Sequence, residues 1–196
     1  MFLALIVGEN EVDEFSSPNS FYTALYGADE ELLLEDSFQH DMDDVLEELI
    51  SHAYLRTLQD ELDDQLFGLQ SLAIAWDGKQ PKGYGFIYWP GPRELGVADL
   101  IPGCPEIFRM TVMPKYQSAG IGSEIVYFLE DQAKSKGYAS IGLAVAYDNT
   151  RAAALYRRLG YAETVANDFT ASYKQERSDA SVKTITERCT FLQKLL

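Results

Sequence analysis

Positively charged residues are scarce in the first third of this 196-residue sequence. Residues 1–70 contain 18 Asp and Glu but one basic residue, Arg56, whereas residues 71–196 carry 13 acidic and 15 basic residues. The net charge of the whole chain is −15. An acidic segment of this kind repels nucleic acid and attracts cations, so we expect no nucleic-acid partner. The remainder is close to neutral and tolerates an anionic ligand, while many of the N-terminal acids are equally well explained as a solubilising surface.

Cysteine, histidine and long apolar runs are scarce as well. Two cysteines, Cys104 and Cys189, and two histidines, His40 and His52, are too few and too scattered for a zinc site or a disulfide framework. We therefore expect no bound metal, and reduced thiols as in cytoplasmic proteins. No apolar run reaches the ~20 residues that cross a bilayer, so we expect no membrane partner. Residues 1–8 are apolar but lack a basic segment before them, which is typical of a first strand and not of a signal peptide.

The most informative stretch is residues 105–122, PEIFRMTVMPKYQSAGIG. Its apolar and β-branched part, residues 106–113, predicts a buried strand, which Pro114 ends because proline cannot donate to a sheet ladder. A turn with two glycines follows, and then helical periodicity over residues 123–136. Such a turn directs backbone N–H groups and the positive end of a helix dipole at one point, where phosphate oxygens bind well. Taken alone, the two glycines are explained better by a plain turn, since they fit neither a dinucleotide fold nor a Walker loop.

A second stretch, residues 148–161 (DNTRAAALYRRLGY), predicts a short helix capped by Asp148 or Asn149 and ended by Gly160. Together the two stretches resemble the signatures of the GNAT superfamily of N-acyltransferases. Residues 112–122 are similar to its acyl-CoA pyrophosphate loop, Q/R-x-x-G-x-G/A, and residues 149–161 to its motif N-x-x-A-x-x-x-Y-x-x-x-G-F/Y. The likeness extends over residues 70–165 and is poor over residues 1–69.

The resemblance implies the GNAT fold, an α/β (α+β) architecture with a central mixed, mostly antiparallel sheet flanked by helices. The length favours a single domain over residues 1–196. The patterns predict strands at residues 2–7, 69–76, 83–89, 106–113, 138–147, 161–165 and 189–195. They also predict helices at residues 21–25, 41–66, 123–136 and 149–159, and loops at residues 90–104 and 167–183.

By resemblance, acetyl-CoA is the expected co-substrate. Backbone groups of Met110, Thr111 and Val112 would pair with pantetheine in a slot where their strand diverges from its neighbour, and Asn149 would approach the same arm. The pyrophosphate would lie against the loop and helix start formed by Gln117, Ser118, Ala119, Gly120, Ile121, Gly122 and Ser123. Many members of the family carry an arginine in this loop and this chain does not, so we expect backbone donors, and Lys115 at most, to hold the phosphates.

Transfer of an acetyl group from a thioester to an amine needs a base and an acid, but no metal or protein nucleophile. Tyr156 holds the position of the family's general-acid tyrosine, although a plain core tyrosine would also explain it. Glu106 matches the catalytic glutamate of the branch that includes histone acetyltransferases, and burial would raise its pKa toward the working range. A strand-entry carboxylate, with an ordered water as base, is the alternative. Another branch uses a glutamate at a position that is Ala144 here, and Cys104 has no visible partner as a nucleophile.

The main prediction is therefore a cytoplasmic N-acetyltransferase that works by direct attack in a ternary complex. The acidic N-terminal third favours a primary amine of a cationic small molecule as the acceptor. One alternative is a peptide or protein acetyltransferase acting on N-termini or lysines, and another is an acyl-CoA-binding module without turnover. Dimers are frequent in similar proteins, so a homodimer stays open.

Overall fold

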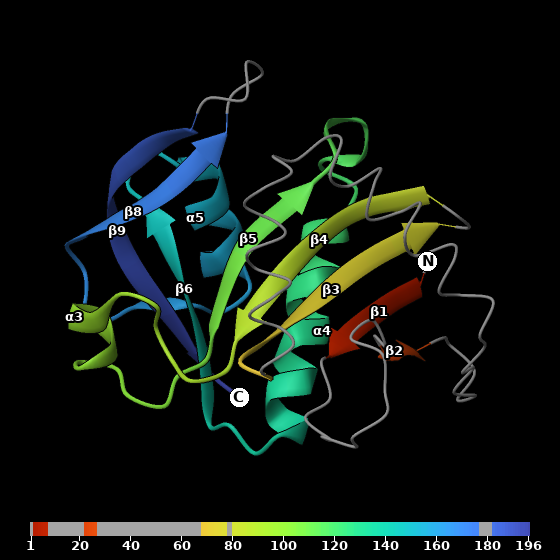
Figure 1. Ribbon diagram of the computed structural model, residues 1–196, viewed down its shortest axis with the longest axis horizontal. Helices are drawn as coiled ribbons and strands as arrows, with labels where there is room; N and C mark the ends of the chain where they lie inside the picture. Colours follow the sequence, from red (N-terminus) through yellow and green to blue (C-terminus); the bar gives the residue numbers. More distant parts are fainter. Residues whose placement is uncertain (1, 8–21, 27–67, 78–79, 177–181) are drawn as a thin grey trace.

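The computed structural model describes residues 2–7, 22–26, 68–77, 80–176 and 182–196. Strands from these residues form one twisted sheet in the order β2-β1-β3-β4-β5-β6-β9-β7, with β8 attached to β9 (Figure 1). The strands are β1 (Phe2–Val7), β2 (Tyr22–Tyr26), β3 (Gln70–Asp77), β4 (Gln80–Tyr88), β5 (Glu106–Val112), β6 (Ser140–Ala146), β7 (Ala162–Glu163), β8 (Phe169–Glu176) and β9 (Val182–Leu195). In the described part of the chain, β5 and β6 make the only parallel pair. The predicted α/β fold with a mostly antiparallel sheet is confirmed.

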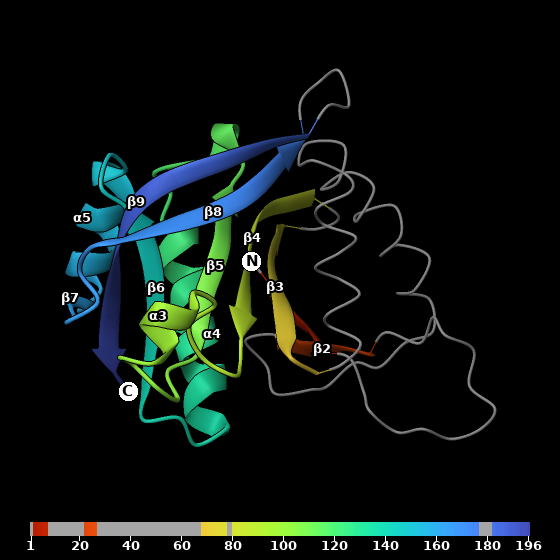
Figure 2. The same cartoon turned by 60° about the vertical axis from the view of Figure 1, so that its left-hand side comes forward.

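Two helices, α4 (Ile121–Ser135) and α5 (Thr150–Arg158), lie on one face of the sheet (Figure 2). Apolar residues recur along α4 at three- and four-residue steps, which is the spacing that buries one side of a helix. These side chains form the main core together with residues of the central strands, among them Ile125, Leu129, Ile87, Ile107 and Leu143. No helix in the described ranges is long and apolar enough to cross a lipid bilayer.

The opposite face carries a smaller core. Short helix α3 (Leu95–Ala98) lies in the connection between β4 and β5, and its Val97 is buried with Cys104, Ala144 and Phe191. Leu143 and Ala144 are neighbours on β6 but belong to different clusters, because successive side chains of a strand point to opposite faces. The connection between β4 and β5 therefore covers the face that the long helices leave free.

Strands β5 and β6 separate soon after they begin. Their pairing consists of Glu106 with Gly142 and Ile107 with Leu143. On its other edge β5 continues to pair with β4, through a register shift opposite Gly85. Arg109 lies at this irregularity in the left-handed region, with φ of 50°, as expected of a residue in a β-bulge. Beyond Ile107 the two strands diverge toward their C-terminal ends (Figure 1).

Three sequence-based expectations about elements are wrong. Residues 22–26 form strand β2 and not a helix, because they pair with β1 and so gain backbone hydrogen bonds. Residues 90–104 contain α3. The segment expected as a loop at residues 167–183 contains all of β8 and the start of β9. The expected helix at residues 41–66 lies outside the described residues.

Strand β8 and the part of β9 before Cys189 escaped prediction because this ribbon lacks an apolar alternation. It is held by a long antiparallel ladder and by cross-strand pairs between polar side chains. Ser172 and Thr186 hydroxyls hydrogen-bond at 3.1 Å, and the Tyr173 hydroxyl donates to Glu187 at 3.1 Å. Pairs of this kind stabilise a sheet without a buried face.

Gly142 allows β6 to pass beneath Phe191. A Cβ at this position would lie 2.3 Å from the Phe191 ring, which is buried. We expect Gly142→Ala to lower the free energy of unfolding by about 1–3 kcal/mol, as overpacking of a filled core does. Urea unfolding measures this change. Gly96→Ala is the matched control, because a Cβ on Gly96 meets no atom within 4 Å; equal losses in both variants would contradict the packing argument.

Candidate active site

A cavity of about 720 Å³ opens where β5 and β6 separate. Three elements line it: the second half of β5, the turn into α4 and the outward face of α5. The lining residues are Met110, Val112, Tyr116, Gln117, Ser118, Gly120, Ile121, Gly122, Ser123, Asn149, Arg151, Ala152, Ala154, Leu155, Tyr156 and Arg158. The structure therefore brings together the two stretches that the sequence singled out.

The turn into α4 has the backbone geometry of an anion site. After the short 3-10 helix η1 (Pro114–Tyr116) the chain turns through Ser118, with φ of 65°, and Gly120, with φ of 89°. Gly120 is the N-cap residue of α4, so the first N–H groups of the helix, which lack intrahelical acceptors, start at the cavity wall. A Cβ on Gly122 would make ordinary van der Waals contacts with Val112 at 3.5 Å and Leu155 at 3.7 Å, so packing does not require a glycine at this position.

Arg151 supplies the turn with a cation that sequence reasoning missed. Its guanidinium, from the first turn of α5, donates to Gln117 Oε1 and to Ser118 Oγ, both at 3.0 Å. Arg158, two turns further along α5, also lines the cavity. Lys115 lies instead over the Tyr116 ring, 4.8 Å from its centre, and does not line the cavity. The sequence offered Lys115 at most as a side-chain cation for this loop, and the structure adds Arg151 from a helix over 30 residues away in sequence.

The other predicted donor-site residues divide into two groups. Met110, Val112 and Asn149 line the cavity with the loop residues, whereas Thr111 and Ala119 do not. Thr111 pairs with Tyr84 of β4, and its hydroxyl donates to the Arg109 carbonyl at 3.3 Å. The Asn149 side chain accepts the Ala152 N–H at 3.2 Å, so this residue caps α5 while also facing the cavity.

Tyr156 lies at the inner end of the cavity wall, on α5. Its side chain is 7% exposed, and its ring packs edge-on against Tyr161, with 6.0 Å between ring centres. Burial raises the pKa of Tyr156 to about 12. The phenol therefore stays protonated at neutral pH and can act only as a proton donor.

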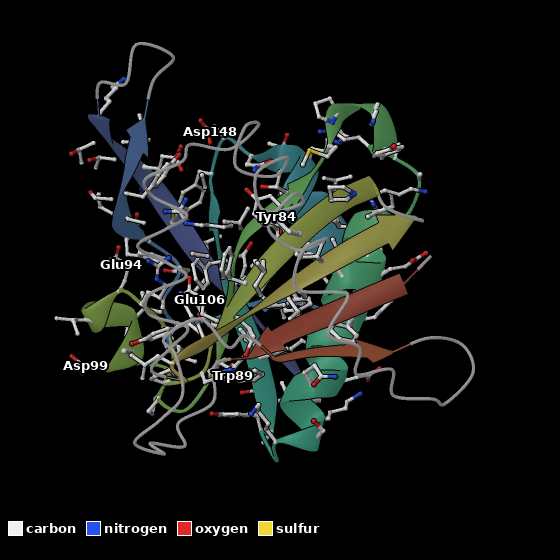
Figure 3. The ribbon with its side chains drawn as sticks, turned by 45° about the vertical axis from the view of Figure 1, so that its right-hand side comes forward. Tyr84, Trp89, Glu94, Asp99, Glu106 and Asp148 are labelled. Atoms are coloured by element: carbon white, nitrogen blue, oxygen red, sulfur yellow. The ribbon has the colours of Figure 1, made fainter. Side chains whose placement is uncertain are left out.

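Glu106 does not line the cavity. It begins β5, and it lies on the face opposite to its neighbour Ile107, which packs among the helices. The carboxylate is 6% exposed and its Oε2 accepts the Arg93 backbone N–H at 2.6 Å. Burial raises the pKa of Glu106 to about 7, although the N–H groups of Arg93 and Ala144 and the charge of Arg93 oppose the shift. Figure 3 shows Glu94 on the loop side of Glu106, and the Glu94 charge adds to the rise in pKa.

Aromatic side chains adjoin Glu106 on this second face. Tyr88 is its cross-strand partner on β4. Phe86 pairs with Phe108 in the same way, with 5.3 Å between ring centres, and Tyr84 meets Phe86 edge-on at 6.2 Å. The aromatic side chains of β4 are thus next to the carboxylate.

Two further observations bear on the chemistry. The described ranges hold no group of three or more His, Cys, Asp and Glu side chains placed to bind a metal ion, and both histidines fall outside these ranges. Cys104 is buried and unbridged, and burial raises the pKa of its thiol. A thiol of this kind is a poor nucleophile.

Comparison with known proteins assigns the chain to a family. Residues 22–161 match the model of the acetyltransferase (GNAT) family. The chain is 30% identical over 106 residues to probable N-acetyltransferase 14 of Xenopus tropicalis, which covers 46% of this chain and 52% of that protein. It is 37% identical over 57 residues to the [ribosomal protein bS18]-alanine N-acetyltransferase of Escherichia coli K12, covering 29% of this chain and 38% of the enzyme. The matches thus span about half or less of the curated relatives.

Two solved structures share the fold. The ribosomal-protein-alanine N-acetyltransferase of Brucella melitensis superposes with a TM-score of 0.51 at 18% identity, over 72% of this chain and 78% of that one. An acetyltransferase of Bacillus subtilis in complex with CoA gives the same TM-score and identity, over 72% of this chain and 86% of that one. On the family match and the fold, the chain belongs to the GNAT acetyltransferase family.

Proposed function

We propose that this protein is an N-acetyltransferase that transfers an acetyl group from acetyl-CoA to an amino group of a protein or peptide. The observation that carries the donor half is the cavity at the separation of β5 and β6. It combines an anion-binding helix start, two arginines and an unpaired strand edge in one place. A long, flexible thiol carrier with a pyrophosphate at one end matches each of these features.

In this proposal the residues of the cavity divide the work by chemistry. The N–H groups of Gly120, Ile121 and Gly122 and the Arg151 guanidinium hold the pyrophosphate, while the Ser123 N–H donates to the Gly120 carbonyl at 2.9 Å. The edge of β5 at Met110 and Val112, which no longer pairs with β6, holds the pantetheine amides as an added strand would. Tyr156 gives its proton to the sulfur as the thiolate leaves.

The amine approaches from the opposite face of the sheet. There the Glu106 carboxylate accepts the proton that an ammonium must lose before it can attack. A pKa near 7 suits that task, because the ionised base is well populated at neutral pH and still binds a proton appreciably. A water molecule between the amine and Glu106 is compatible with this assignment.

The acceptor proposed here differs from the one that the main sequence-based prediction favoured. A cationic small molecule was favoured by the acidic residues 1–70, most of which lie outside the described part of the chain. Two of the compared proteins are named for acetylating the alanine of a ribosomal protein. These names support a protein amine, in line with the alternative drawn from the sequence.

An acceptor screen tests the proposal. Thiol release from acetyl-CoA is followed with three kinds of acceptor. The first is a peptide with a free N-terminal alanine, the second is a peptide with an acetylated N-terminus and an internal lysine, and the third is spermidine. We expect the free N-terminal peptides to accelerate thiol release most. If spermidine alone accelerates thiol release, the acceptor is a cationic small molecule and not a protein. Binding of acetyl-CoA by calorimetry with no acceleration by any amine would favour the non-catalytic module.

Arg151 gives a test of the donor site alone. We expect Arg151→Ala to weaken acetyl-CoA binding about tenfold, the size of effect that loss of a charge-assisted hydrogen bond produces, with kcat at saturation nearly unchanged. Isothermal calorimetry measures the first and steady-state kinetics the second. Arg157→Ala is the matched control on the same helix, because Arg157 pairs with Glu163 at 2.8 Å and does not line the cavity. If both substitutions weaken binding equally, Arg151 has no specific contact with the phosphates.

A further inference from the structure

The connection between β4 and β5 donates a hydrogen bond to Glu106 from Arg93. Its backbone N–H donates to Glu106 Oε2 at 2.6 Å. Its guanidinium lies over the Phe108 ring, 4.1 Å from the ring centre. Phe108 stands two residues after Glu106 on β5, so it points to the same face as the carboxylate. One residue of the connection therefore contacts both the carboxylate and the side chain beside it.

The start of this connection is fixed to the sheet. Trp89 donates its indole N–H to Ser71 Oγ at 3.0 Å and its backbone N–H to the Leu69 carbonyl at 2.8 Å. Its ring stacks on Tyr138, whose hydroxyl donates to the Trp89 carbonyl at 3.1 Å. Prolines at positions 90 and 92 then restrict the backbone up to Arg93. The Arg93 N–H is thus held in place before any substrate binds, which is how a positioned hydrogen bond avoids an entropic cost.

We propose that Arg93 is the positioning residue for the Glu106 carboxylate, with its N–H fixing the orientation of the carboxylate and its guanidinium, stacked on Phe108, holding the connection against it. This inference rests on the proposed function, in which Glu106 is the base. The neighbouring residue Glu94 acts on the same carboxylate with the opposite charge, so Arg93 and Glu94 have opposite effects on the pKa of Glu106.

The described groups around the carboxylate are few. The connection contributes Arg93, Glu94 and, at its far end, Cys104. Strand β4 contributes Tyr88 across the pair, and β6 contributes the Ala144 N–H. Arg93 favours the ionised carboxylate and Glu94 disfavours it. A change at either residue should therefore move the titration of Glu106, and the two changes should move it in opposite directions.

The test compares Arg93→Ala, Arg93→Lys and Glu94→Gln in the full chain. The readouts are the pH dependence of kcat/KM and the carboxyl 13C shift of Glu106, which titrates without any substrate. We expect Arg93→Ala to move both titrations to higher pH. It should also lower kcat/KM about threefold more at pH 6 than at pH 9, because a higher pKa of Glu106 reduces the ionised fraction of its carboxylate at pH 6 but hardly at pH 9. Glu94→Gln should move both to lower pH. Arg93→Lys keeps the charge but not the planar stack, so its titration should stay closer to that of the wild type.

The outcomes distinguish failure of the positioning role of Arg93 from failure of the proposed function. Opposite shifts for Arg93→Ala and Glu94→Gln support the positioning role, and a structural effect of two substitutions in one loop would not produce them. If the titration of Glu106 does not move, or moves in the same direction in both variants, the positioning role is overturned. This holds even if Glu106→Gln abolishes the acidic limb of the pH profile of kcat/KM. If Glu106→Gln keeps the wild-type profile, Glu106 is not the base, and the proposed function and this inference fail together on that point. Circular dichroism of each variant excludes loss of the fold.

Discussion

Replacing Tyr156 with phenylalanine is expected to lower kcat by about two orders of magnitude, the lower end of what a positioned general acid contributes. The departing thiolate would then have no proton donor, because Tyr156 is the buried phenol that lines the inner part of the cavity. Binding of acetyl-CoA should change little, since the ring remains and its contact with Tyr161 is kept. Stopped-flow measurement of thiol release gives kcat, and calorimetry gives the affinity for acetyl-CoA.

Tyr161→Phe is the matched control for this prediction. Tyr161 is also buried and contacts Tyr156, but it does not line the cavity. Its loss of a hydroxyl should alter kcat less than about threefold, as expected for a group that does not touch the reacting atoms. Unchanged turnover in Tyr156→Phe, or an equal loss in both variants, would remove Tyr156 as the acid.

Glu106→Gln is expected to lower kcat/KM by about a hundredfold at pH 8 and to abolish the acidic limb of the pH profile. In the wild type, kcat/KM should rise with pH through about 7 and then level off, because only the ionised carboxylate accepts a proton and burial raises its pKa to about 7. The amide of glutamine accepts no proton at any of these pH values. The measurement is kcat/KM from pH 5.5 to 9 with a peptide acceptor.

Stability gives this variant an internal control. The pKa of Glu106 is higher in the folded chain than in the unfolded chain, so the folded state binds more protons between about pH 4.5 and 7. The wild type therefore loses stability at this site as the pH rises through that range, and the Gln variant does not. We expect the Tm of Glu106→Gln relative to the wild type to increase from pH 5 to pH 8. An acidic limb that survives the substitution would assign the base to water or to another group.

The two candidate catalytic residues lie on opposite faces of the sheet, an arrangement that suits the proposed division of work between an acid and a base. Tyr156 belongs to the core on the helical face, whereas Glu106 lies on the face of Phe86 and Phe108. In the proposed function, the two substrates come together where β5 and β6 stop pairing after Leu143. A thioester entering from one side and an amine from the other would meet there, and the acid and the base would each stand on the side where its proton is needed.

Local sequence was sufficient wherever the chain's own backbone decides the structure. Proline ends β5 because it has no N–H, and Asn149 caps α5 because its side chain bonds an N–H three residues ahead. Gly120 begins α4 because the turn needs a positive φ. The strand–turn–helix unit, the second helix and their shared cavity were therefore predictable from residues 105–161, and so was the raised pKa of a glutamate buried in β5.

Tertiary structure decided what depends on contacts between distant residues. No spacing rule relates Arg151 to Gln117 and Ser118, which it meets across 34 and 33 residues, so the cation beside this loop was missed. Residues 22–26 became a strand because β1 offers an edge to pair with, against their local helical pattern. Arg93 reaches Glu106 because Trp89 fixes the connection between them. Short-range periodicity determines where elements begin and end, but only folding brings donors, acceptors and charges from separate elements to within hydrogen-bond distance.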